Sequence, residues 1–113
     1  MFFADQLAAA GMHRCGVIVN RVHRRESARV DVAEITAQLT PVLGARLAAR
    51  VARTHAEVQL LARRDAAAVN RLRRALREPD AVCLAEREHE VRSIEGLVEL
   101  SAELFARQPA RVT

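Results

Sequence analysis

Hydrophobic residues run without interruption in two short segments of the chain. The first follows Gly16, contains Val17, Ile18 and Val19, and ends at Asn20. A β-branched run without polar alternation predicts a strand buried on both faces, at about residues 15–20. A second run at 81–85 predicts another such strand. In parallel sheets ligands bind beyond the carboxyl ends of strands, which makes Asn20 a candidate ligand residue.

Elsewhere apolar positions recur at three- and four-residue steps, which predicts helices. The first predicted helix covers residues 2–10, and Gly11 is placed to end it. Asp31 is a candidate N-cap for a short helix over 32–39. Ser93 is a candidate N-cap for a last helix that reaches Phe105.

The longest helical pattern begins at Thr40-Pro41, with threonine as the N-cap and proline at the first helical position. It continues to Leu76 and would be about 55 Å long as one helix. We therefore expect a break or kink near residues 54–57. Pro79 then marks a turn before the second strand.

The predicted order is α-β-α-α-β-α, which makes the chain α/β and rich in helix. Strands joined by a helical crossover should be parallel, with a right-handed connection. A two-stranded sheet has two unpaired edges and is rarely stable alone. No strand precedes the first helix to feed it, so we interpret residues 1–113 as a single partial domain.

The amino-acid composition excludes several kinds of catalytic and phosphate-binding site. All 18 basic residues are arginine, so a P-loop lysine, a Schiff-base lysine and a lysine general base are excluded. The spacing of the glycines fits neither G-x-x-x-x-G-K-[ST] nor G-x-G-x-x-G, the two glycine-rich patterns that bind phosphate groups. The net charge of +4 leaves a nucleic-acid binder open, through Arg21, Arg24, Arg25 and Arg29. Only 3% of residues are aromatic, which makes nucleic acid a less favoured partner.

The cysteines and histidines of the sequence do not indicate a metal site or a redox site. We expect Cys15 and Cys83 to be buried free thiols, with a disulfide or a metal role as the alternatives. No two histidines have helical metal spacing, and we expect all four to be solvated. Without a leader or a membrane-spanning stretch in these residues, we expect a cytoplasmic protein.

Asn20 carries the clearest chemical signal. Its amide offers an acceptor and a donor group, which suit the N6-amino and N7 edge of adenine. An asparagine that forms a turn after a strand is the alternative.

The segment Gly16-Val17-Ile18-Val19-Asn20-Arg21-Val22 resembles the G-V-V-V-N-R-V of ArsA-type anion-transporting ATPases. That family includes tail-anchored-protein targeting ATPases and belongs to the MinD/ParA group of P-loop proteins. Residues 2–12, 60–65, 81–84 and 90–97 are similar to the helix before a late strand and to the closing helix, strand and helix of such proteins. The resemblance covers nearly the whole chain, but only the last third of an ATPase.

The resemblance implies a helix-rich part of a P-loop NTPase fold, without its P-loop and switch regions. It implies an adenine-binding role for Asn20 and a place near the nucleotide for Arg21, Leu84, Ala85, Glu86 and Arg87. Ala85 stands where the family usually has proline. ATP with Mg²⁺ is the implied cofactor of an intact member, and we expect no hydrolysis by this chain alone.

The expected partner is a second copy or an N-terminal ATPase part. The alternative function is a non-enzymatic helical module whose amphipathic helices bind a partner protein or oligomerise.

Overall fold

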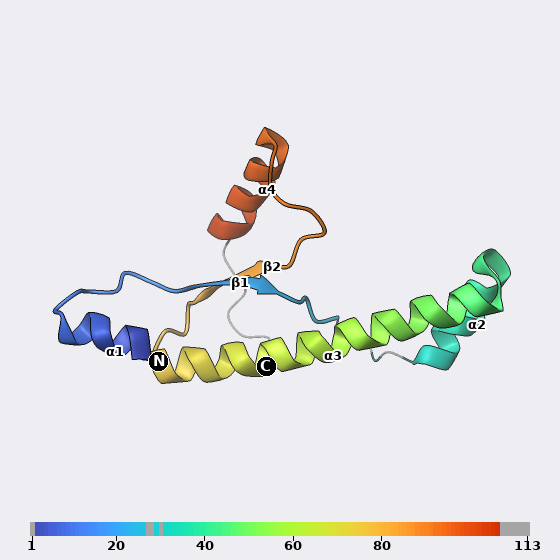
Figure 1. Ribbon diagram of the computed structural model, residues 1–113, viewed down its shortest axis with the longest axis horizontal. Coiled ribbons are helices and arrows are strands. Elements are labelled where there is room, and N and C mark those ends of the chain that lie inside the picture. The colour runs from blue at the N-terminus through green and yellow to red at the C-terminus, as the bar shows by residue number, and fades with distance from the viewer. Residues whose placement is uncertain (1, 27–28, 30, 107–113) are drawn as a thin grey trace. The chain divides into compact units, whose positions relative to one another are not determined.

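The computed structural model describes residues 2–26, 29 and 31–106 as a mixed α/β fold that is mostly helical (Figure 1). The elements are α1 (Phe2–Ala9), β1 (Ile18–Val22), α2 (Val32–Leu43), α3 (Ala45–Leu76), β2 (Val82–Ala85) and α4 (Ile94–Phe105). Their order is the predicted α-β-α-α-β-α.

The chain divides into two compact units. The first unit comprises Met1–Val22 and Ala67–Thr113, and the second comprises His23–Ala66. Both strands lie in the first unit together with α1 and α4, while α2 lies in the second. Helix α3 begins in the second unit and ends in the first. The expectation of a single partial domain over residues 1–113 stays a prediction.

Strands β1 and β2 form a two-stranded parallel sheet, as predicted. The Val82 N–H donates to the Val17 carbonyl, and the Glu86 N–H donates to the Val22 carbonyl, each at 2.9 Å. Between these bonds the register shifts, so β1 carries an irregularity after Val19.

The prediction for β2 was correct to within one residue, but β1 lies further along the chain than predicted. It covers Ile18–Val22 rather than residues 15–20, so Asn20 lies inside the strand and not at its end. The expected burial on both faces is also wrong, because Ile18 is 58% exposed and Asn20 is exposed. Within the first unit β1 packs closely only with β2.

Two helices end in the same hydrogen-bonded turn. At the end of α1, Gly11 has a φ of 71°, and its N–H and that of Met12 donate back to Ala8 and Leu7. This is a Schellman motif with glycine at the left-handed position, as the sequence predicted. At the end of α3, Arg77 takes the same position with a φ of 55°.

The capping residues of α2 and α4 were also predicted correctly. The Asp31 carboxylate accepts from the Ala33 and Glu34 N–H groups, and the Ser93 hydroxyl accepts from the Gly96 N–H at 3.1 Å. Each bond satisfies a backbone donor that the first helical turn leaves without a partner. The short polar residues therefore fix where these helices begin.

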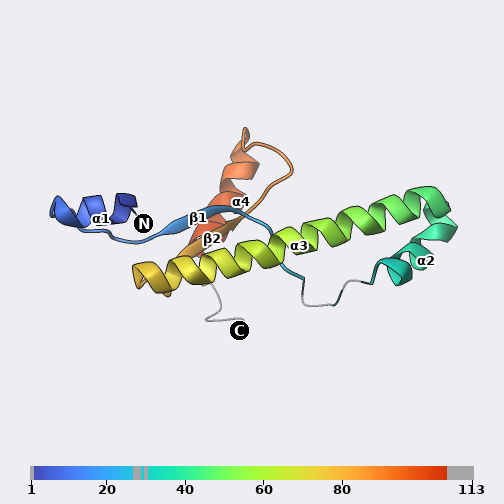
Figure 2. The same ribbon diagram turned by 60° about the horizontal axis from the view of Figure 1, so that its bottom comes forward.

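The predicted helix start at Thr40-Pro41 is wrong. Pro41 lies within the last turn of α2, where its missing N–H affects only one helical bond. Thr40 does not cap a new helix, because its hydroxyl donates back to the Thr36 carbonyl at 2.6 Å. The chain instead turns at Gly44, which has a φ of 77°, and α2 lies beside the first part of α3 in both views (Figures 1 and 2).

The break expected near residues 54–57 is absent, and α3 is continuous over 32 residues. The expectation rested on length alone. No glycine or proline lies between Ala45 and Leu76, and alanine, leucine, glutamine and arginine all favour helix. Composition therefore outweighs length in this segment.

The interior is built from small side chains. In the second unit Ala48, Ala52 and Ala62 on α3 are fully buried and Gln59 is 7% exposed. In the first unit Val69, Ala81 and Leu84 are buried. No large side chain is fully buried in the described part of the chain. Helix α4 has no buried residue, although it packs against β2.

A candidate nucleobase cleft

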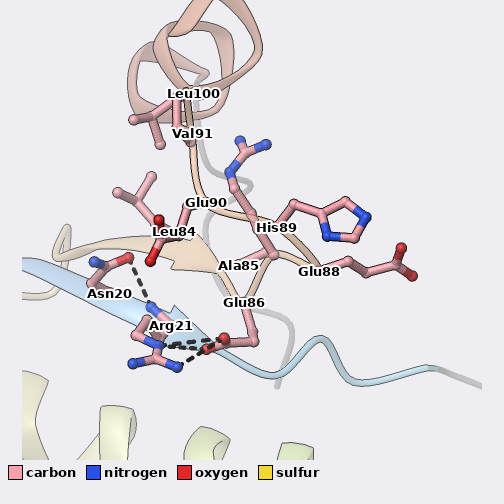
Figure 3. A pocket seen from close by; sticks show the side chains of 11 residues that line it. Asn20, Arg21, Leu84, Ala85, Glu86, Glu88, His89, Glu90, Val91 and Leu100 are labelled. Carbon is pink, nitrogen blue, oxygen red and sulfur yellow. Dashed lines mark hydrogen bonds and ion pairs between the residues drawn. The ribbon is translucent and has the colours of Figure 1, made fainter. Parts of the chain in front are cut away.

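The sequence-predicted site residues come together in an open cleft of about 490 Å³ in the first unit (Figure 3). All six line it: Asn20, Arg21, Leu84, Ala85, Glu86 and Arg87. Two come from β1, and the others come from the end of β2 and the loop that follows. The parallel pairing brings them together, because it places the ends of β1 and β2 at the same edge of the sheet.

Asn20 is held by a bond within its own strand. Its Oδ1 accepts from the Arg21 N–H at 2.9 Å. This bond fixes the side-chain rotamer and orients the amide, because only the amide oxygen can accept from an N–H group. The bond satisfies a backbone donor where the register of β1 shifts. One lone pair of Oδ1 and both Nδ2 hydrogens remain for a ligand. Asn20 therefore has a structural role in addition to any role in binding.

Arg21 closes one side of the cleft with Glu86. The residue has a left-handed φ of 58°, and its Nε and Nη2 donate to the two Glu86 carboxylate oxygens at 3.0–3.3 Å. The bonds to this carboxylate raise the pKa of Arg21 above its ordinary value. The pair is a forked ion pair across the two strands, so the two charges largely offset each other.

The opposite side of the cleft is apolar. Leu84 is 8% exposed, and Val91 and Leu100 are half-buried. Figure 3 shows these three side chains in a column that leads from β2 to α4. A flat aromatic ring placed against this column would bury apolar surface while its edge faced polar groups.

Ala85 uses a backbone donor that proline would lack. Its N–H donates to the Glu103 Oε1 at 2.8 Å, and the Glu103 Oε2 accepts from Arg87 at 3.0 Å. Glu103 on α4 therefore joins the outer edge of β2 to the loop after it.

The charges of the lining do not favour an anion. Two arginines face three carboxylates, those of Glu86, Glu88 and Glu90. Arg87 is also paired with Glu99 at 3.3 Å and with Glu103. These lining residues therefore suit an uncharged ring better than a triphosphate.

The histidines differ from the expectation that all are solvated. His23 is half-buried, and its N–H and Nδ1 both contact the Asp65 Oδ2, at 3.0 and 2.8 Å. The backbone and side-chain bonds from His23 lower the pKa of Asp65. His55 lies 3.4 Å from a Glu26 carboxylate oxygen. Both pairs lie in the second unit and tie the segment after β1 to α3.

Cys15 and Cys83 are free thiols, but the expectation that both are buried is wrong. Cys15 is exposed and Cys83 is half-buried. Burial raises the pKa of the Cys83 thiol, and Arg73 opposes this shift. Residues 2–26, 29 and 31–106 contain no group of three metal-ligating side chains.

Neither the protein-family models nor the curated proteins contain a significant match to this sequence. No helix in the described ranges is long and apolar enough to cross a membrane.

The sequence reasoning missed the outer wall of the cleft. Five further lining residues are Glu88, His89, Glu90, Val91 and Leu100. It also missed Glu103, which lies 18 positions after its partner Ala85. No local pattern marks such a pair, because the contact depends on how α4 returns over β2.

Proposed function

We propose that this chain supplies one wall of an adenine pocket, as the C-terminal part of an ArsA-like ATPase. The convergence of Asn20 with the end of β2 on one cleft carries the proposal. The amide of Asn20 would address the polar edge of the base. The column of Leu84, Val91 and Leu100 would contact its face.

The phosphates of ATP and a Mg²⁺ ion require groups other than those of this cleft. The sequence has no lysine, and the arginines of the lining are paired with carboxylates. In an intact ATPase, Mg²⁺ and a phosphate loop stabilise the charge that develops on the transferred phosphoryl group. The residues of this chain would bind and orient the base. Another polypeptide segment would stabilise the charge on the phosphoryl group.

Two substitutions of Asn20 separate its structural role from binding. Asn20→Asp keeps an oxygen for the Arg21 N–H but removes the Nδ2 donor, while Asn20→Ala removes both. We expect a fluorescent adenosine analogue to bind the wild-type chain and to bind both variants at least about tenfold more weakly. Only the alanine variant should also lose stability in urea. Equal affinity of all three proteins would refute the adenine assignment.

The absence of catalysis by the chain alone is a separate expectation. Purified protein with Mg²⁺ and ATP should release phosphate no faster than buffer. Turnover that requires Mg²⁺ and is lost in Asn20→Ala would contradict the assignment of phosphate chemistry to another segment.

A helical interaction module remains the second candidate, favoured by one observation in the second unit. Leu47, Val51, Val58 and Leu61 share one face of α3 and are 36–46% exposed. Such a stripe is typical of a helix that packs against another helix. Val51→Glu should abolish binding of a helical partner and leave the nucleotide affinity unchanged.

A further inference from the structure

Arg21 adopts a backbone conformation that is unusual inside a strand. Its φ of 58° lies in the left-handed region, which a residue with a Cβ rarely occupies. In the described part of the chain the other such non-glycine residue is Arg77, which ends a helix, where this conformation is common. Arg21 instead lies within β1 and lines the cleft. Strained residues persist where their surroundings hold them, and they cluster at ligand sites.

The left-handed residue belongs to a bulge in β1. Across the register shift, Asn20 and Arg21 together lie opposite the single residue Leu84 of β2. A bulge interrupts the alternation of side chains along a strand and can aim one of them at a site. Within this bulge the Asn20 amide oxygen accepts from the Arg21 N–H at 2.9 Å. The direction of the Asn20 amide therefore depends on the conformation of Arg21.

The Arg21 side chain ties the bulge to the loop after β2. Its Nε and Nη2 donate to both Glu86 carboxylate oxygens at 3.0–3.3 Å (Figure 3). The Glu86 N–H also donates to the Val22 carbonyl at 2.9 Å, so Glu86 contacts two successive residues of β1. The Arg21 side chain is 77% exposed, but the forked geometry is the one in which an exposed ion pair keeps measurable strength.

We propose that Arg21 and Glu86 are positioning residues. Their ion pair holds the bulge, and the bulge aims the Asn20 amide at the 6-amino group of a bound adenine. This inference rests on the proposed binding of adenine and adds the residues that set its selectivity. Recognition of the amino group then depends on two side chains that act through Asn20.

Two nucleosides isolate the contact that Asn20 makes. Adenosine and purine riboside differ only in the 6-amino group, so the ratio of their dissociation constants measures recognition of that group. A loss of fold stability would weaken both ligands equally and leave this ratio unchanged. We expect the wild-type chain to prefer adenosine at least about fivefold, and Asn20→Ala to bind both nucleosides about equally.

Three variants test the positioning role. Arg21→Ala and Glu86→Ala each remove the fork, and we expect them to lower the preference for adenosine about three- to fivefold. Arg21→Gly also removes the fork but adopts the left-handed conformation at little cost, so it should retain part of the preference that Arg21→Ala loses. Arg14→Ala and Glu78→Ala are the matched controls. They break an ion pair of 3.3 Å outside the cleft and should keep the wild-type preference.

The outcomes separate the two claims. A wild type without preference for adenosine would refute the adenine assignment and this inference with it. A wild-type preference that persists in Arg21→Ala and Glu86→Ala would overturn the positioning role alone, and so would an equal loss in Arg21→Gly and Arg21→Ala. Amide exchange gives a check without ligand. The Arg21 N–H, which the Asn20 oxygen protects, should exchange faster in Glu86→Ala than in the wild type, and an unchanged rate would also overturn the role.

Discussion

Glu103 is a side chain whose removal should markedly weaken the first unit. Its carboxylate accepts from the Ala85 N–H at 2.8 Å and from Arg87 at 3.0 Å, and 17% of the side chain is exposed. Glu103→Ala would leave a half-buried backbone donor without its charged acceptor. A hydrogen bond to a charged group contributes roughly 1.5–3 kcal/mol. The ion pair adds up to about 1 kcal/mol, because Arg87 is partly exposed.

We therefore expect Glu103→Ala to lower the free energy of unfolding by roughly 2–4 kcal/mol. Glu103→Gln keeps a neutral acceptor for the Ala85 N–H but loses the ion pair and the charge on that acceptor, so it should cost roughly 1–2 kcal/mol. Glu99→Ala is the matched control, since Glu99 pairs with the same arginine but is 71% exposed. Its effect should be within about 0.5 kcal/mol of zero.

Urea titrations followed by far-ultraviolet circular dichroism measure these differences. The order Glu103→Ala, then Glu103→Gln, then Glu99→Ala should appear in the transition midpoints. If Glu103→Ala unfolds at the same urea concentration as Glu99→Ala, the bond to the β2 edge does not stabilise the sheet.

Three further predictions concern other parts of the chain. Gly44→Ala should destabilise the α2–α3 turn by roughly 1–3 kcal/mol in urea, because a φ of 77° strains any residue with a Cβ even where space is open; an unchanged midpoint would contradict this. Because the folded pKa of Asp65 is below its unfolded value of about 3.8, its stabilisation is present above that pH and is lost as the pH falls through the folded pKa. The wild type should thus be more stable than Asp65→Asn near neutral pH, and the difference should shrink in acid; a constant difference would argue against the Asp65–His23 pair. A thiol reagent should modify exposed Cys15 faster than Cys83, whose burial raises its pKa, and Cys15→Ser should remove the fast phase.

Local signals in the sequence predicted much of the fold. Asp31, Ser93 and Gly11 mark helix ends because each acts on backbone groups within a few residues, and the two apolar runs located both strands. Two predictions within the long helical region were wrong for the opposite reason. Thr40-Pro41 satisfied a local start pattern, but the backbone turns at Gly44, and length alone did not break α3.

The cleft could be predicted only in part. Asn20 and the end of β2 follow from parallel pairing, because the ends of both strands meet at one edge. The rest depends on contacts between distant residues. Arg21 meets Glu86 across 65 positions, and α4 brings Leu100 and Glu103 back over β2. The bond between Asn20 and the Arg21 N–H arises from the register shift in β1, which no residue pattern marks.

The central claim is that the cleft binds a nucleobase through Asn20. A titration of isotope-labelled protein with adenosine, followed by nuclear magnetic resonance, tests it most directly. We predict that the Asn20 side-chain amide and the backbone amides of 84–91 shift together and saturate, while those of α2 do not move. Saturable shifts confined to other residues, or none at millimolar adenosine, would contradict the claim.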